Sequence, residues 1–248
     1  IKSASAQHAD IIIFPEDFLT GGMTDKEIAQ FADFNNKYLK IFQRFAKKYK
    51  IDIVPGSIIV GKKTGKYNTC YYIDHNGKLR GKYEKINLWL TERKHITAGN
   101  KISVFNTRFG KVGLAICWDL MWPEVFRAMA KKGVKVVFCP SLWYKGIGFE
   151  PYLKNNPNAE KDHINSLCFT RAIENNIVFI FVNAVGRMKS SGGYFDNAIG
   201  QSQITAPIVG LFNKPNNKEE MFIRDVDLDI LNDAEMAYEI RRDLKTKL

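Results

Sequence analysis

The sequence predicts a layered α/β domain, and two patterns support this prediction. Short apolar runs rich in β-branched residues, typical of strands buried on both faces, alternate with segments whose apolar residues recur at helical spacing. With 248 residues, of which 45% are hydrophobic, the chain can bury a large core, and no linker-like stretch or repeat divides it. We therefore expect residues 1–248 to form one domain of mixed strands and helices in layers.

Residues 1–60 contain the first helix and strand patterns. Residues 1–10 are similar to the end of a helix and lead into the apolar residues 11–14, which are expected to form a strand. Residues 36–50 place apolar side chains at helical spacing between Lys and Arg. An amphipathic helix is predicted there, followed by a strand at residues 51–60.

Two turns between strands are expected next. Residues 61–66 are rich in Gly and Lys, but they stand between strands and lack the glycine spacing of a phosphate loop, which indicates a charged hairpin turn. Residues 67–85 alternate on both sides of Asn76-Gly77, which supplies the positive φ angles of a tight turn. A hairpin is therefore predicted for residues 67–85.

The remaining elements are predicted from helix ends and apolar runs. Pro123 opens and Gly133 ends one helical pattern, and Asp162 is expected to be the N-cap of another. Strands are expected at residues 111–117, 134–139, 177–182, 198–204, 208–212 and 220–226. After Asp229 the chain is polar, and we expect a C-terminal arm.

Charge and cysteine content argue against several other classes of protein. The chain carries 37 Lys and Arg against 26 Asp and Glu, a formal charge of +11, but these basic residues are scattered and do not form a nucleic-acid footprint. The four cysteines lack the spacing of a zinc site, and no apolar stretch approaches the ~20 residues of a membrane span. We expect a cytoplasmic protein with reduced thiols that binds neither nucleic acid nor membranes.

Three ionisable residues stand at the ends of predicted strands, where α/β folds assemble their sites. Glu16 follows the first strand, Lys85 ends the hairpin, and Cys117 ends the strand at residues 111–117. Each residue type alone is common in loops or cores, but together they meet the needs of acyl transfer. A cation beside the thiol favours its ionised form and stabilises an oxyanion. A carboxyl group can pass a proton to the leaving amine.

A series of local motifs surrounds these residues and runs in order over nearly the whole chain. It consists of Phe14-Pro15-Glu16, Tyr83-Glu84-Lys85, Gly113-Leu114-Ala115-Ile116-Cys117-Trp118-Asp119, Trp122-Pro123-Glu124, Arg171-Ala172-Ile173-Glu174-Asn175, Gly200-Gln201-Ser202 and Asp227-Leu228-Asp229. Together these motifs resemble those of the nitrilase superfamily, the carbon-nitrogen hydrolases. The resemblance implies a four-layer α-β-β-α sandwich, a homodimer or larger even assembly, and no metal or organic cofactor.

The resemblance also implies roles for individual residues. Glu16, Lys85 and Cys117 would form a catalytic triad, with Glu16 as general base and Cys117 as the nucleophile that forms a thioester. Lys85 and the backbone N–H of Trp118 would hold the oxyanion, and Glu92 would buttress the lysine.

Two departures from the family pattern bear on substrate and fold. Asp119 stands where true nitrilases carry Glu, so small linear amides or N-carbamoyl compounds are favoured over nitriles. We expect Asp119, Trp143 and Tyr144 to line the substrate pocket, although an aromatic cluster of Trp143, Tyr144 and Phe149 fits a capped core equally well. Relatives carry an extra strand and a full helix before Glu16, so the domain is expected to lack its first strand and part of its first helix.

The same residues leave alternatives open. Nitrile hydrolysis, or transfer of the acyl group to an amine, would use the same site. A non-catalytic scaffold of this fold would have no need to keep the triad together. Release of free carboxylate without an added acceptor distinguishes a hydrolase from an acyltransferase.

Overall fold

The computed structural model describes residues 1–146, 150–189 and 195–246, and within them two main β-sheets face each other. The first sheet contains β1 (Ile11–Ile13), β2 (Asp52–Val54), β3 (Ser57–Lys62), β4 (Gly65–Ile73) and β5 (Leu79–Glu84). The second runs in the order β13 (Gly210–Leu211), β12 (Gln203–Ala206), β9 (Val178–Asn183), β8 (Val136–Ser141), β7 (Gly110–Leu114) and β6 (Ser103–Thr107). Apart from both, β10 (Val185–Lys189) pairs antiparallel with β11 (Phe195–Ile199).

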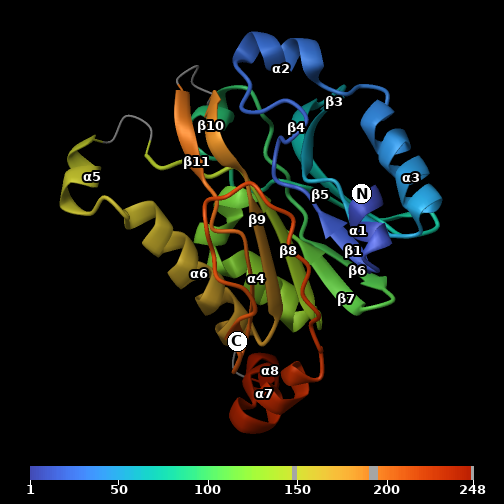
Figure 1. Ribbon diagram of the computed structural model, residues 1–248, viewed down its shortest axis with the longest axis vertical. Helices are drawn as coiled ribbons and strands as arrows, with labels where there is room; N and C mark the ends of the chain where they lie inside the picture. The colour runs from blue at the N-terminus through green and yellow to red at the C-terminus, as the bar shows by residue number, and fades with distance from the viewer. Residues whose placement is uncertain (147–149, 190–194, 247–248) are drawn as a thin grey trace.

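Helices cover the outer face of each sheet, and the chain therefore forms four layers (Figure 1). On the first sheet lie α1 (Lys2–Ala6) and α3 (Lys37–Tyr49), and on the second lie α4 (Pro123–Lys131) and α6 (Ala159–Asn175). The other helices are α2 (Asp25–Phe31), α5 (Glu150–Asn155), α7 (Ile230–Tyr238) and α8 (Ile240–Thr246). Among the described helices, none is long and apolar enough to cross a membrane.

One hydrophobic core fills the space between the two sheets. Tyr72 and Tyr83 enter it from the first sheet, and Leu114 and Phe138 enter it from the second. These side chains are at most 2% exposed, and burial of each large apolar group stabilises the fold by about 1.5–3 kcal/mol. The predicted α-β-β-α sandwich is confirmed.

Two local predictions are confirmed with their physical causes. The helix predicted at residues 36–50 is α3, and the Asp33 carboxylate accepts hydrogen bonds from the backbone N–H groups of Lys37 (2.9 Å) and Tyr38 (3.0 Å) at its start. The predicted hairpin joins β4 to β5, and its turn contains Gly77 at φ +80°.

The single strand predicted at residues 51–60 is wrong, because β2 and β3 are separate strands. Pro55 lacks a backbone N–H, and Gly56 turns the chain with φ +61°. A side chain at Gly56 would meet the carbonyl oxygen of Pro15 at 1.9 Å. The break therefore lets the chain pass close to the segment that carries Glu16.

Two later strand predictions are also corrected. Residues 198–204 form parts of β11 and β12, because Gly200 (φ +68°) and Gln201 (φ +65°) turn the chain between them. The strand predicted at residues 208–212 is reduced to β13 (Gly210–Leu211).

The strand predicted at residues 220–226 is absent from the described structure. A groove of about 1510 Å³ separates this segment from β1, so no hydrogen-bonded ladder joins them. Ile11 and Ile13 line one side of the groove, and Met221 and Val226 line the other. Apolar spacing alone does not make a strand when no neighbouring backbone is within reach.

Two helix predictions near the end of the chain need correction as well. Asp162 is not an N-cap, because α6 begins at Ala159 after the cap residue Asn158, and Asp162 lies in the first turn. The chain after Asp229, where a C-terminal arm was expected, forms the helices α7 and α8, with Leu231, Ala234 and Leu244 buried. These apolar positions were too sparse in a polar sequence to indicate helices.

Candidate active site

Glu16, Lys85 and Cys117 meet inside the sandwich, where elements of both sheets end. Glu16 follows β1, Lys85 follows β5, and Cys117 begins the 3-10 helix η2 (Cys117–Met121) just after β7, so it does not end that strand as predicted. The three residues are 3%, 2% and 6% exposed, respectively. Lys85 Nζ lies 3.0 Å from Glu16 Oε1, and the Cys117 thiol lies close enough to both groups for their charges to act on it. The tertiary structure thus brings the predicted set together.

Glu16 is held by donors from distant parts of the chain. Asn68 Nδ2 donates to Oε1 at 2.8 Å, and the backbone N–H of Leu142 donates to Oε2 at 2.8 Å. Such bonds orient the carboxylate and favour its charged form. Asn68 was missed by the sequence reasoning, and its only signal was a polar side chain inside an otherwise apolar strand.

Lys85 is clamped between two carboxylates. Besides its contact with Glu16, Nζ lies 2.7 Å from Glu92 Oε2. Glu92 is itself oriented by the backbone N–H of Trp89 at 2.7 Å and by Asn68 Nδ2 at 3.2 Å. The predicted contact of Glu92 with the lysine is therefore present in the structure.

The backbone of Cys117 has a left-handed conformation with φ +45°. A non-glycine residue in this region carries strain of order 1–3 kcal/mol, and such strain clusters at functional sites. The Sγ atom lies 3.9 Å from the carbonyl oxygen of Leu142, the same residue that holds Glu16. The sharp turn between β7 and η2 thus presents the thiol toward the carboxylate.

Burial sets the protonation of the site. It raises the pKa of the Cys117 thiol well above its usual range, and the negative charge of Glu16 adds to this, while Lys85 opposes it. Burial also raises the pKa of Glu16, and Lys85 offsets part of that rise. Burial would lower the pKa of Lys85, but Glu16 and Glu92 outweigh it and hold that pKa well above normal. The resting site therefore has a neutral thiol and a charged lysine.

Asp119 does not line a pocket, so that prediction is wrong. It is fully buried, and Oδ2 accepts hydrogen bonds from Tyr83 Oη (2.8 Å) and the Ile116 N–H (2.9 Å). Its other oxygen accepts from the backbone (3.0 Å) and side-chain (2.9 Å) nitrogens of Asn87. The carboxylate is saturated with donors and ties the segment that carries the nucleophile to the segment that carries the lysine.

The aromatic residues after β8 differ in their surroundings. Trp143 is 6% exposed and belongs to the core, with its ring 5.4 Å from that of Trp118 and its Nε1 donating to Glu160 at 2.6 Å. Tyr144 is partly buried, and Oη donates to the Lys189 carbonyl at 3.1 Å. Phe149 lies outside the described residues.

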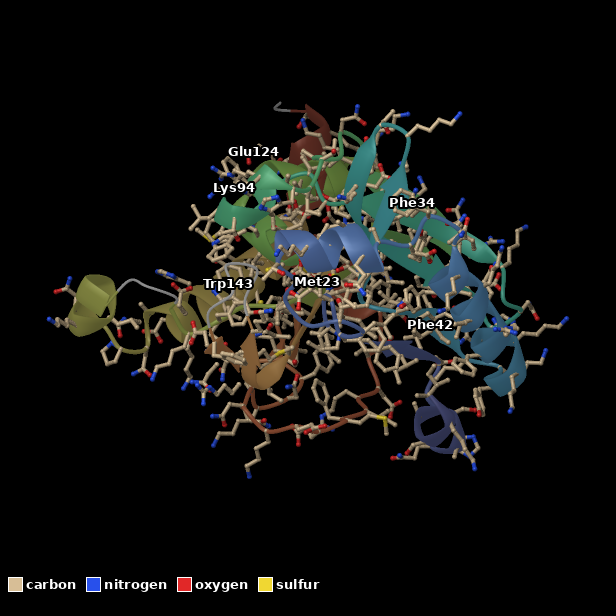
Figure 2. All side chains as sticks on the ribbon, turned by 90° about the horizontal axis from the view of Figure 1, so that it is seen from above. Met23, Phe34, Phe42, Lys94, Glu124 and Trp143 are labelled. Carbon is tan, nitrogen blue, oxygen red and sulfur yellow. The ribbon has the colours of Figure 1, made fainter. Side chains whose placement is uncertain are left out.

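The helix α2 and the paired strands β10 and β11 lie at the top of Figure 1. Lys189 of β10 pairs with Glu27 of α2 at 3.1 Å, and a side chain at Gly21 would lie 3.6 Å from Met188. Figure 2 looks down on this end and shows Met23, just before α2, between Trp143 on one side and Phe42 of α3 on the other.

The described residues contain no group of three or more His, Cys, Asp or Glu side chains placed to hold a metal ion. All four cysteines are free and buried. A buried thiol, an ammonium group and carboxylates on an α-β-β-α sandwich are the components of acyl transfer through a cysteine.

Comparisons with known proteins agree with this class. The family model for carbon-nitrogen hydrolases matches residues 1–235, and the chain belongs to that family. It is 32% identical to a probable nitrilase of Schizosaccharomyces pombe over 226 residues (89% of this chain, 76% of the relative). It is 27% identical to the 2-oxoglutaramate amidase of Bacillus subtilis (96% and 88% covered) and 26% identical to the N-carbamoylputrescine amidase of Arabidopsis thaliana (100% and 85%).

Solved structures share the fold. A carbon-nitrogen hydrolase from Helicobacter pylori G27 superposes with a TM-score of 0.83 at 20% identity, covering 98% of this chain and 86% of that one. A mutant amidase from Nesterenkonia sp. AN1 superposes with a TM-score of 0.71 at 22% identity (88% and 77% covered). That amidase carries the acetamide moiety of fluoroacetamide covalently bound at its active-site cysteine.

Proposed function

We propose that this chain hydrolyses the carbon–nitrogen bond of small linear amides or N-carbamoyl compounds through a thioester on Cys117. The observation that supports this most is the position of Lys85 Nζ, 3.0 Å from Glu16 and 2.7 Å from Glu92, beside the buried thiol. Those contacts use two of the three ammonium donors and leave the third for a substrate oxygen.

Acylation begins with proton transfer from the Cys117 thiol to the Glu16 carboxylate as sulfur attacks the carbonyl carbon. The carbonyl oxygen becomes an oxyanion, which Lys85 and the backbone N–H of Trp118 stabilise. The intermediate collapses when its carbon–nitrogen bond breaks, and Glu16 gives its proton to the departing ammonia or amine. The acyl group remains on sulfur.

Deacylation repeats these steps with water. Glu16 accepts a proton from water as the water oxygen attacks the thioester carbon, and the same donors hold the second oxyanion. The carbon–sulfur bond then breaks, and the thiolate recovers the proton from Glu16. A free carboxylic acid leaves, and the enzyme returns to its starting state.

The substrate class is supported by burial and by the relatives. The three central side chains are at most 6% exposed, so a folded polypeptide does not reach them. Two of the relatives are named amidases of small molecules. Nitrile hydrolysis and acyl transfer use the same groups and are outcomes of the test. We further propose that residues 1–248 act as one domain in the cytoplasm, where its free thiols stay reduced, and as a homodimer.

The test is a substrate panel assayed for ammonia release, with aliphatic amides, ω-amides, N-carbamoyl amino acids, nitriles and a peptide. Intact-mass analysis and peptide mapping should find an acyl adduct on Cys117, and free carboxylate should appear without an added acceptor. Cys117→Ala should abolish turnover, whereas Cys139→Ala, which changes another buried free thiol, should retain it. An adduct on Cys139 or Cys168, or turnover of nitriles alone, would contradict the proposal.

A further inference from the structure

Asp17 is a third carboxylic acid beside the site, and the mechanism above does not use it. It follows Glu16 directly and has a left-handed backbone with φ +50°. Its N–H donates to Ser57 Oγ at 3.4 Å, and its carbonyl accepts from the N–H groups of Thr20 (3.0 Å) and Gly21 (2.7 Å). These bonds hold the residue in one orientation.

The side chain of Asp17 has an oxygen atom that no hydrogen-bond donor in the described part of the chain contacts. Its Oδ1 is buried and has no hydrogen-bond partner among the described residues. A buried carboxylate oxygen without a hydrogen-bond donor destabilises the charged form of the group. Lys85 is a cation that acts on Asp17, but its ammonium is already shared by Glu16 and Glu92.

The charges of Asp17 and of the nucleophile both act on Tyr144. After burial, the largest influence on the Tyr144 phenol is the charge of Asp17, followed by Glu16 and Cys117, and together these raise the pKa of Tyr144. The Tyr144 phenol is therefore close enough to both Cys117 and Asp17 for their charges to affect it. An acyl group that is bound to Cys117 and extends past Tyr144 would bring its far end toward Asp17.

We propose that Asp17 is a specificity-determining residue that pairs with a cationic group at the far end of the substrate. The inference rests on the proposed function and deepens it: the preferred substrates are amides or N-carbamoyl compounds that carry an amine. A carboxylate at the same end would face Asp17, Glu16 and Glu92 and be repelled. An aromatic wall such as Tyr144 suits a cation as well.

Binding of such a cation should release a proton. In the empty site, burial and then the charges of Glu16 and Glu92 raise the pKa of Asp17 well above normal, while Lys85 opposes the rise. An ammonium group lowers that pKa, so its affinity should increase as pH rises through the pKa of the empty site. A neutral amide of the same shape should lack this dependence.

Three substrates of matched length test the proposal: δ-aminovaleramide, hexanamide and the monoamide of adipic acid. The wild type should prefer them in that order, with kcat/KM about tenfold or more higher for the amine than for the alkyl amide, as expected for a charge-assisted bond. Asp17→Asn should remove this preference, and Asn tolerates the left-handed backbone. The control Asp196→Asn loses the same charge, but that carboxylate already accepts from Gly146 N (3.1 Å) and Asn197 N (2.6 Å), so the preference should remain.

A binding measurement separates this inference from the proposed function. Calorimetry with the Cys117→Ala variant should find tighter binding of δ-aminovaleramide than of hexanamide, with proton release, whether or not the wild type turns either over. Equal binding of the two, a preference for the carboxylate, or an unchanged preference in Asp17→Asn would overturn the role of Asp17. Turnover of hexanamide would leave the proposed function standing in each of those cases.

Discussion

At the residue scale, Lys85 is the group on which the proposed chemistry depends most, because its charge serves both the thiolate and the oxyanion. We expect Lys85→Met to lower kcat/KM by on the order of a hundredfold or more, as removal of an oxyanion donor does elsewhere. The matched control is Lys82→Met on the preceding strand β5, whose Nζ pairs with Glu84 at 2.7 Å and whose side chain is 36% exposed. Steady-state kinetics should separate the two variants, and wild-type activity in Lys85→Met would mean that the lysine is only structural.

The raised pKa of Glu16 predicts the acid side of the pH profile. Glu16 must be ionised to accept the thiol proton, so kcat/KM should fall as pH drops through a pKa above the ordinary glutamate range. Asn68→Ala removes a hydrogen bond to the charged carboxylate, and this acid limb should then move to still higher pH. A limb at an ordinary glutamate pKa in the wild type would exclude Glu16 as the buried base.

Asp119 is expected to act as a positioning residue. Asp119→Asn puts an amide N–H₂ where the carboxylate now faces only donors, which leaves buried donors unsatisfied at about 1–3 kcal/mol each. We expect kcat to fall more than KM rises, because the nucleophile and lysine segments lose their common anchor. Tyr83→Phe removes one of the bonds and should have the same effect in weaker form. An Asp119→Asn variant with the wild-type kcat would show that the carboxylate serves stability alone.

At the element scale, the break between β2 and β3 places the segment of Glu16. Gly56→Ala would bring a methyl group within 1.9 Å of the Pro15 carbonyl oxygen, in addition to the left-handed backbone. The backbone term costs about 1–2 kcal/mol and the overpacking a further ~1–3 kcal/mol. Gly186→Ala is the matched control, because Gly186 has φ +88° but open space around it. Thermal unfolding and activity should both drop further for Gly56→Ala, and equal losses would contradict the role of the close approach.

At the scale of the whole molecule, an exposed apolar surface predicts association. Phe169 of α6 is 42% exposed and lies beside Gly210, and Val209 and Leu211 around it are each 48% exposed. We expect light scattering to report a dimer or a larger even assembly, and Phe169→Asp to weaken it. Phe195→Asp, at a 64% exposed position on β11, is the control and should leave the assembly intact. A wild-type monomer at micromolar concentration would contradict this prediction.

The prediction of the fold from the sequence succeeded where short-range signals were sufficient. The helix at residues 36–50 and the hairpin at residues 67–85 depend on local spacing and on Asn76-Gly77, and both are present. A strand at residues 220–226 needs a neighbouring strand to pair with, and a groove lies between this segment and β1. Of the helices after Asp229, α8 packs against α4 and α6, and Leu231 of α7 joins the main hydrophobic core, which a polar sequence does not indicate.

The sequence by itself determined the layered class of the fold, and it predicted that Glu16, Lys85 and Cys117 belong to one site. Residue type and local motif were sufficient for both. Only the tertiary structure decided how these groups are held and charged. Asn68 reaches Glu16 from 52 residues away and Leu142 from 126 residues away. Burial and neighbouring charges set the pKa values of Glu16, Lys85 and Cys117, and packing made Asp119 an anchor and left Asp17 Oδ1 without a partner in the part of the chain that the structure describes. No local pattern encodes them, because they exist only once distant segments pack together.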